Sequence, residues 1–204
     1  MIAIVDFDIG NLEAVASMLH RVGVPSRITA KPADIEQADR IILPGNGAFD
    51  ACMRGLRATG LVPLLERRVL QEKVPLLGIC VGAQMLGQGS DEGQESGLGW
   101  MKLRSVRFPP QPGLKVPHMG WNEVRPARAG APQLAGLEED ARFYFVHSYH
   151  LVAQDPADVM LWAHYGQDFA AAVAHGHIMG VQFHPEKSHR YGKQLLAAFA
   201  KGPA

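Results

Sequence analysis

A cysteine between two glycines stands at the end of an apolar run in the stretch VPLLGICVGAQMLGQGS, residues 74–90. Gly78 and Gly82 each lie two positions from Cys80. If a strand ends at Cys80 and a helix begins at once, the sharp turn lifts the sulfur away from the sheet, as in a nucleophile elbow. The helix N-terminus would also favour the thiolate, which is the reactive form. The alternative is a buried cysteine that packs as a small hydrophobe.

A cysteine nucleophile needs a base, and the base needs a group that orients it. The segment GVQFHPEKS, residues 180–188, offers both in His184 and Glu186. If residues 181–184 continue as a strand, the two side chains point to the same face, and the carboxylate can hold one imidazole nitrogen while the other faces the sulfur. On its own the segment is more typical of a solvated turn, but its combination with Cys80 favours catalysis.

The first half of the chain alternates between apolar runs and helical patterns, which positions these groups. The runs lie at residues 2–5, 40–43 and 74–80, and helix-like segments follow at 12–22, 48–70 (interrupted near Gly60 and Pro63) and 81–88. This alternation predicts an α/β fold, in which a mostly parallel sheet carries helices on both faces. Functional loops are then expected at the carboxyl ends of the strands.

The second half changes character. Short β-like runs separated by turns occupy residues 103–108, 143–152, 159–165, 169–176 and 178–184, and a final helix is expected at 189–201. We therefore predict an antiparallel or mixed extension of the sheet. Because no repeat, linker or low-complexity segment is found, residues 1–204 are interpreted as a single domain.

Composition limits the class of protein. Of the 204 residues, 20 are Lys or Arg and 20 are Asp or Glu, so the formal net charge is zero and no basic block indicates nucleic-acid binding. Two cysteines are too few for a disulfide framework, which favours a reducing cytoplasm. The apolar runs are shorter than the roughly 20 residues that span a bilayer, so no membrane association is expected.

The two segments that carry Cys80, His184 and Glu186 resemble motifs of a known enzyme family. GICVGAQML and GVQFHPEKS resemble the triad motifs of class I glutamine amidotransferases, which carry the nucleophile in Gly-x-Cys-x-Gly-x-Gln and the other two members in His-Pro-Glu. The segments IVDFDIGNL, LPGNGAF, GLGW, VPHMGWN and YFVHSYH resemble, in order and over essentially the whole chain, the glutaminase subunits of imidazole glycerol phosphate synthase, an enzyme of histidine biosynthesis. The resemblance implies a three-layer glutaminase fold.

The resemblance also implies a reaction, for which no cofactor or metal is expected. Cys80 would attack the side-chain amide of glutamine, and His184 would protonate the departing ammonia. A water activated by His184 would then hydrolyse the thioester to glutamate, while Glu186 holds the ring and stabilises its cation.

The tetrahedral intermediates need pre-placed donors for their oxyanion. The Val81 amide, at the helix start, is one candidate. The other would come from PGNG, residues 44–47, where the two glycines let the backbone of Gly45, Asn46 and Gly47 turn amides toward a ligand. The stretch alone is more typical of an ordinary Gly-rich turn.

Two further residues are candidates for binding the substrate. Gln84 lies one helical turn beyond Cys80 on the same face and can reach the polar end of glutamine. By resemblance Glu92 would meet the α-ammonium group, although an acidic residue beside glycines is usually a solvated loop.

Free ammonia is mostly protonated in neutral water, so a glutaminase that feeds a synthase gains from direct transfer. The resemblance supplies a (β/α)₈ cyclase as the partner in a heterodimer, with allosteric activation of the glutaminase. It places Asn11, Trp121, Tyr144 and Lys187 at the docking face. Trp121 and Tyr144 are typical interface anchors, yet buried core aromatics are the commoner explanation for any single one.

The chain departs from the family at two positions. Valine is common where this chain has Asn46, and glycine where it has Asp8. In this family the oxyanion-hole peptide is thought to face away until the partner and its ligand arrive. Because Asn tolerates positive φ better than a β-branched residue, we hypothesise that Asn46 lowers the cost of the flip and raises basal activity. Asp8 concerns only the detail of the first loop.

Other functions remain as alternatives. The chain could serve a different amidotransferase, be a related cysteine hydrolase, or be a binding subunit that keeps the fold without the reaction; such a subunit should have lost a member of the triad. The HGH stretch at 175–177 is interpreted as a hairpin turn and not as a metal site, because no third ligand follows at a useful spacing. Cys52 is expected to pack in the core.

Overall fold

The computed structural model describes residues 1–202 apart from 129–133, 135 and 139. Five strands form a parallel unit in the order β2, β1, β3, β4, β11. Their bounds are β1 (Ile2–Val5), β2 (Ser26–Thr29), β3 (Arg40–Leu43), β4 (Leu76–Ile79) and β11 (Ile178–Val181). All residues of β1, β4 and β11 are buried, as the continuous apolar runs predict for a sheet covered on both faces.

Antiparallel strands extend the sheet beyond β11 in the order β10, β9, β6, β7, with β8 against β10 and β5 against β8. Their bounds are β5 (Leu103–Arg107), β6 (His118–Pro126), β7 (Arg142–His147), β8 (Tyr149–Ala153), β9 (Val159–Tyr165) and β10 (Gln167–His175). This is the antiparallel extension that the second half of the sequence predicts.

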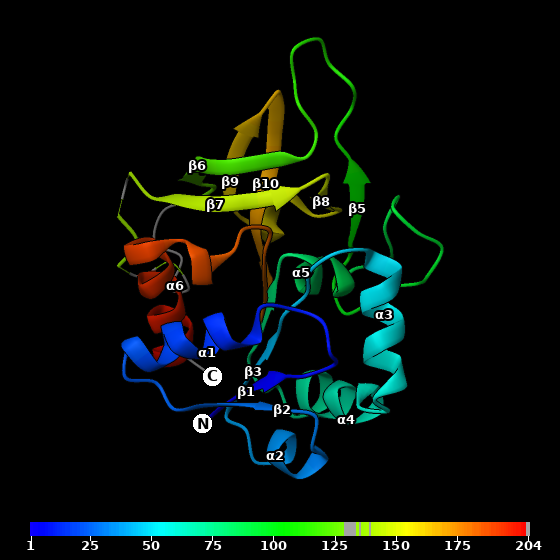
Figure 1. The fold of residues 1–204 in the computed structure, drawn as a ribbon, viewed down its shortest axis with the longest axis vertical. Helices are drawn as coiled ribbons and strands as arrows, with labels where there is room; N and C mark the ends of the chain where they lie inside the picture. Colours follow the sequence, from blue (N-terminus) through cyan, green and yellow to red (C-terminus); the bar gives the residue numbers. More distant parts are fainter. Residues whose placement is uncertain (129–133, 135, 139, 203–204) are drawn as a thin grey trace.

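Helices cover the parallel strands on both sides (Figure 1). The α-helices are α1 (Leu12–Arg21), α2 (Pro32–Glu36), α3 (Phe49–Ala58), α4 (Val62–Glu66), α5 (Val81–Met85) and α6 (His189–Lys201). A π-helical turn η1 (Arg67–Gln71) follows α4, and the 3-10 turns are η3 (Pro156–Asp158) and η4 (Pro185–Lys187). Helices α1 and α6 pack together on one side, and α3 packs with α5 on the other (Figure 1). None of the helices described is long and apolar enough to cross a membrane.

Sequence patterns predicted most of these elements, and two of the three misses, both of them strands, share a cause. β2, α2 and β6 were not predicted. β2 lies at a sheet edge and is only partly buried, and in β6 only His118 and Val124 are buried, so neither strand forms an apolar run. The prediction that a strand continues to residue 184 is wrong, because β11 ends at Val181 and His184 joins β7 only through an isolated bridge to Tyr144.

Asp8, one of the two departures from the family pattern, has a φ of 64°. This left-handed region favours glycine, and Asp is among the few other residues that adopt it routinely. The Asp8 N–H also donates to Asp6 Oδ1 at 3.1 Å, which supports the turn locally. The departure therefore keeps the backbone shape for which glycine would be chosen.

Candidate active site

Cys80 occupies the predicted corner between β4 and α5. Its backbone has φ 54° and ψ −113°, a strained conformation for a residue with a side chain. A Cβ on Gly78 would lie 2.8 Å from backbone atoms of Ala83, and one on Gly82 would lie 2.0 Å from the Leu43 carbonyl oxygen. Both glycines are therefore required where the helix crosses the strands, and the tight strand-to-helix corner is confirmed.

His184 and Glu186 are paired and buried. His184 Nδ1 lies 2.8 Å from Glu186 Oε1. Strand alternation predicted this pairing, but His184 belongs to an isolated bridge and Glu186 to the turn η4, which folds the carboxylate back toward the ring. Burial alone would lower the pKa of His184, but the neighbouring Cys80 and Glu186 side chains raise it from 6.5 to about 10. Within the described residues, His184 Nε2 has no hydrogen-bond partner, so this nitrogen is available for chemistry.

The turn that carries this pair is pinned to β7. The His184 N–H donates to the Tyr144 carbonyl at 2.9 Å. In return, the Tyr144 N–H donates to Ser188 Oγ at 3.0 Å, and Ser188 Oγ donates to the His184 carbonyl at 2.6 Å. Tyr144, predicted only as a docking residue, thus also holds the backbone of His184 in place.

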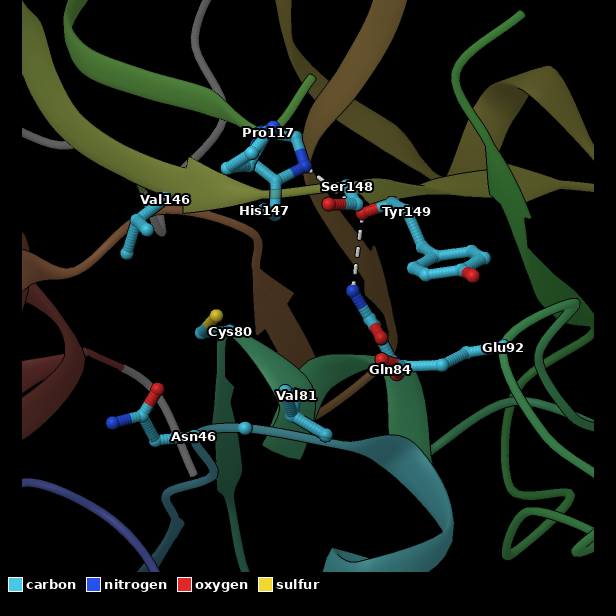
Figure 2. Close-up of a pocket in the computed structure, with 11 residues that line it drawn as sticks. Asn46, Cys80, Val81, Gln84, Glu92, Pro117, Val146, His147, Ser148 and Tyr149 are labelled. Carbon is cyan, nitrogen blue, oxygen red and sulfur yellow. Dashed lines mark hydrogen bonds between the residues drawn. The ribbon is translucent and has the colours of Figure 1, made fainter.

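The corner opens into a cavity of about 290 Å³ (Figure 2). Its lining residues are Asn46, Gly47, Cys80, Val81, Gln84, Glu92, Pro117, Val146, His147, Ser148 and Tyr149. Six of the predicted site residues are among them. The volume suits a small polar molecule, and the lining combines a nucleophile with amide, carboxylate and backbone groups.

The loop after β3 runs along the start of α5. A Cβ on Gly45 would lie 2.4 Å from the Gly82 nitrogen, so only glycine permits this close approach, and Gly47 has a φ of 85°. Asn46 is not in the positive-φ region. Its carbonyl accepts a hydrogen bond from Cys52 Sγ at 3.3 Å. The hypothesis that Asn46 eases a peptide flip stays a prediction.

Cys52 is buried, as predicted, and also takes part in this loop. Burial raises the pKa of the Cys52 thiol to about 11, so the group stays protonated and can donate to the Asn46 carbonyl. No local sequence pattern predicted this role, since nothing marks a cysteine six residues downstream as a support for the loop.

Gln84 and Glu92 lie on the side of the cavity away from Asn46 (Figure 2). Gln84 Nε2 donates to the Tyr149 carbonyl and to Gln182 Oε1, both at 3.2 Å. The Glu92 carboxylate accepts from the Phe49 N–H at 2.9 Å through Oε2, which holds this exposed side chain at the cavity rim. Gln182 was missed by sequence analysis although it stands inside the quoted GVQFHPEKS segment.

The predicted docking residues gather on one surface, beside the pair of His184 and Glu186. Trp121 of β6 stands opposite Tyr144 of β7, with ring centroids 6.3 Å apart, and Lys187 Nζ lies 5.7 Å from the Tyr144 ring centroid. Asn11 lies at the N-cap of α1, and this helix packs against η4. Trp121 is 46% exposed and Met119, on the same side of β6, is 62% exposed, so Trp121 is not a core aromatic.

The HGH stretch forms the hairpin turn between β10 and β11, as predicted. His175 Nδ1 lies 3.0 Å from Asp158 Oδ1, and His177 Nε2 lies 2.7 Å from the Val69 carbonyl oxygen. The two rings are therefore occupied by separate partners.

Known proteins of similar sequence belong to the family that the motifs resemble. Residues 3–201 match the family Glutamine amidotransferase class-I. The chain is 50% identical over 201 residues to imidazole glycerol phosphate synthase subunit HisH 2 of Pseudomonas aeruginosa, covering 98% of this chain and 99% of the relative. It is 46% identical over 204 residues to subunit HisH of Bdellovibrio bacteriovorus, covering 98% and 100%.

Solved structures of lower identity share the fold. The structure of PurLQS from Thermotoga maritima has a TM-score of 0.75 at 19% identity, covering 97% of this chain and 96% of that one. A glutamine amidotransferase from the same organism has a TM-score of 0.62 at 17% identity, covering 97% and 81%. These likenesses establish the three-layer arrangement of helices around a mostly parallel sheet.

Proposed function

The chain belongs to the class I glutamine amidotransferases, in the family of HisH subunits of imidazole glycerol phosphate synthase, and we propose that it releases ammonia from glutamine for a cyclase partner in histidine biosynthesis. One observation carries the assignment: a cysteine on a strained strand-to-helix corner lines a cavity of substrate size, and its side chain, together with Glu186, raises the pKa of the buried His184. Residues 1–204 act in this proposal as one glutaminase domain.

In the proposed reaction, the Cys80 thiolate attacks the side-chain carbonyl carbon of glutamine. The carbonyl oxygen becomes an oxyanion that accepts from the Val81 N–H and from the loop of Gly45 to Gly47, which packs against the start of α5. His184, whose raised pKa favours the imidazolium, donates a proton to the amide nitrogen from Nε2. The C–N bond breaks, ammonia leaves, and a γ-glutamyl thioester remains.

The second half-reaction uses the same groups. His184 is now neutral at Nε2 and accepts a proton from a water that attacks the thioester carbonyl carbon. Collapse of the second tetrahedral intermediate breaks the C–S bond, which releases glutamate and restores the Cys80 thiolate beside the imidazolium. Glu186 holds Nδ1 and stabilises the cation throughout.

Substrate recognition is proposed for Gln84 and Glu92. Both line the cavity with Cys80, and the carboxylate of Glu92 suits an α-ammonium group. The proposed partner is a (β/α)₈ cyclase subunit that docks over Asn11, Trp121, Tyr144 and Lys187. This surface supports direct ammonia transfer, because Lys187 follows Glu186 and Tyr144 holds the His184 backbone.

The test is glutamate release from glutamine by the purified chain, alone and with the cyclase and its ribonucleotide substrate. We expect strong activation by the partner and no activity for Cys80→Ala in either condition. Equal activity with and without the partner would support the proposed glutaminase reaction but would contradict its activation by the partner. Absence of activity in both conditions would favour a non-catalytic binding subunit.

A further inference from the structure

An unbroken chain of polar contacts links strand β6 to the Cys80 sulfur. Its members are Asn122, His118, His147, the Tyr149 carbonyl, Gln84, Gln182 and Cys80. Gln182, the last before the sulfur, is 0% exposed. A buried amide can serve its neighbours only in the orientation that the rest of the network imposes.

The Tyr149 carbonyl sets the direction of this chain. A backbone carbonyl can only accept, so both nitrogens that face it must donate. These are His147 Nδ1 at 2.9 Å and Gln84 Nε2 at 3.2 Å (Figure 2).

The orientation passes from the carbonyl toward the nucleophile. Gln84 Nε2 directs its second hydrogen to Gln182 Oε1 at 3.2 Å. Gln182 therefore turns its Nε2 toward Cys80 Sγ at 3.9 Å, the length of a weak N–H···S contact. A flipped Gln182 would face Gln84 with a donor and the sulfur with an acceptor, so both of its contacts would be lost.

The orientation also extends in the opposite direction, to β6. With its proton on Nδ1, a neutral His147 has its lone pair on Nε2, which accepts from His118 Nδ1 at 3.0 Å. His118 Nε2 in turn accepts from Asn122 Nδ2 at 3.3 Å, and Asn122 Nδ2 also donates to the His164 carbonyl at 2.8 Å. Burial lowers the pKa of His118 to about 4 and that of His147 to about 3, so both rings stay neutral at physiological pH.

Packing holds the two rings in this arrangement. The His118 ring is stacked between Tyr165 and Phe145, with centroids at 4.0 and 4.9 Å. The His147 ring lies 5.3 Å from both Phe108 and Phe169. Rotation of either ring would break hydrogen bonds and these contacts together.

We propose that Gln182 is a further residue of the reaction, which presents an amide N–H to the Cys80 sulfur, and that the chain from Asn122 to Gln84 is the positioning device that keeps it in the donor orientation. The N–H stabilises negative charge on the sulfur in the free enzyme and again when the C–S bond of the thioester breaks. The role of Gln182 in thioester cleavage rests on the proposed glutaminase function, whereas its contact with the Cys80 sulfur is independent of that function.

The experiment measures alkylation of Cys80 by iodoacetamide as a function of pH in the full chain, and glutamine turnover in the complex with the cyclase. Gln182→Glu keeps the shape and the acceptor for Gln84 but replaces the donor by a carboxylate. Gln182→Met removes the donor without adding charge. The matched control is Gln154→Glu, which makes the same charge change at an exposed glutamine bonded to Gln88.

For Gln182→Glu we expect the midpoint of the alkylation profile to rise by about one pH unit or more, and kcat to fall by about 10- to 100-fold with little change in KM. Gln182→Met should also raise the midpoint of the alkylation profile and lower kcat, but by smaller amounts than Gln182→Glu. His184 and, farther off, Cys52 also titrate near the sulfur, and both are unchanged in these variants.

Unchanged midpoints and kcat in both Gln182 variants, folded by circular dichroism, would overturn the proposal. A shifted midpoint in a protein that never hydrolyses glutamine would support the contact and reject the proposed function, so the two failures are distinguishable.

Discussion

At His184, burial and the neighbouring side chains act on the pKa in opposite directions. Burial disfavours the imidazolium, yet Cys80 and Glu186 raise the pKa from 6.5 to about 10. Because the folded-state pKa lies above the ordinary value, folding favours the protonated form. The resulting stabilisation is fully present below pH 6.5 and is lost as the pH rises through about 10.

This predicts a stability difference between the parent chain and Glu186→Gln. The free energy of unfolding of the parent should fall by a few kcal/mol, as an order of magnitude, between pH 6.5 and 10. The free energy of unfolding of Glu186→Gln should fall less over this pH range, since one of the two groups that raise the pKa of His184 is absent. Urea unfolding across this pH range measures both, with Glu123→Gln at an exposed position as the control. Parallel curves for all three proteins would contradict the prediction.

Asn46 gives a second prediction for a single residue. If the oxyanion-hole peptide must flip through positive φ, a β-branched residue makes this conformation more costly by about 1–2 kcal/mol. Asn46→Val should therefore lower glutamate release without the partner by roughly 5- to 30-fold. Basal activity that is unchanged or higher in Asn46→Val would show that the hypothesis is wrong.

At the scale of elements, the site depends on how closely α5 crosses the sheet. A Cβ on Gly82 would lie 2.0 Å from the Leu43 carbonyl, which is fixed in β3, whereas the nearest neighbour of a Cβ on Gly89 is the flexible end of Arg104 at 3.2 Å. Gly82→Ala should thus destabilise the fold by more than about 3 kcal/mol, and Gly89→Ala by less than about 1 kcal/mol. Thermal unfolding of the two variants measures the contrast, and equal melting temperatures would reject this account of the elbow.

The turn η4 connects the catalytic pair with the proposed docking surface. Glu186 is buried in this turn beside His184, which immediately precedes it, whereas Lys187 is exposed, and hydrogen bonds through Ser188 and Tyr144 hold the backbone on either side of the turn. The His184 N–H donates to the Tyr144 carbonyl, so a partner that moves Tyr144 would also move the backbone of His184. Binding at the proposed docking surface could thereby change the position of the catalytic base.

At the scale of the whole molecule, the parallel unit carries the nucleophile, and the antiparallel extension carries Trp121 and Tyr144, the two aromatic residues of the proposed docking surface. Trp121 is the exposed aromatic of that surface, stacked on His189 with centroids 5.4 Å apart. Trp121→Ala should weaken cyclase binding by about 2 kcal/mol or more, a roughly 30-fold increase in Kd. Val152→Ala, at a 42% exposed residue of β8, is the matched control and should leave Kd unchanged. Calorimetric titration with the cyclase measures both, and equal affinities would place the interface elsewhere.

The sequence by itself determined the chemistry-bearing residue types and the alternation that places them. Apolar runs at residues 2–5 and 40–43 predicted β1 and β3 to the residue, and the helical pattern predicted α6, because burial on both faces and a 3.6-residue period are local signals. The Gly-x-Cys-x-Gly spacing likewise predicted the corner, since the crowding that demands glycine acts within five residues of Cys80 and against the adjacent strand.

Only the tertiary structure decided how distant residues meet. The contact of His184 with Glu186 comes from a turn and not from the predicted strand. The link from Asn122 to Cys80 passes through the three strands β6, β7 and β8 and the helix α5. Trp121 meets Tyr144 because of the register between β6 and β7. Strand order and register are set by the packing of the complete sheet, and a local pattern carries no information about which of several possible pairings buries the most surface.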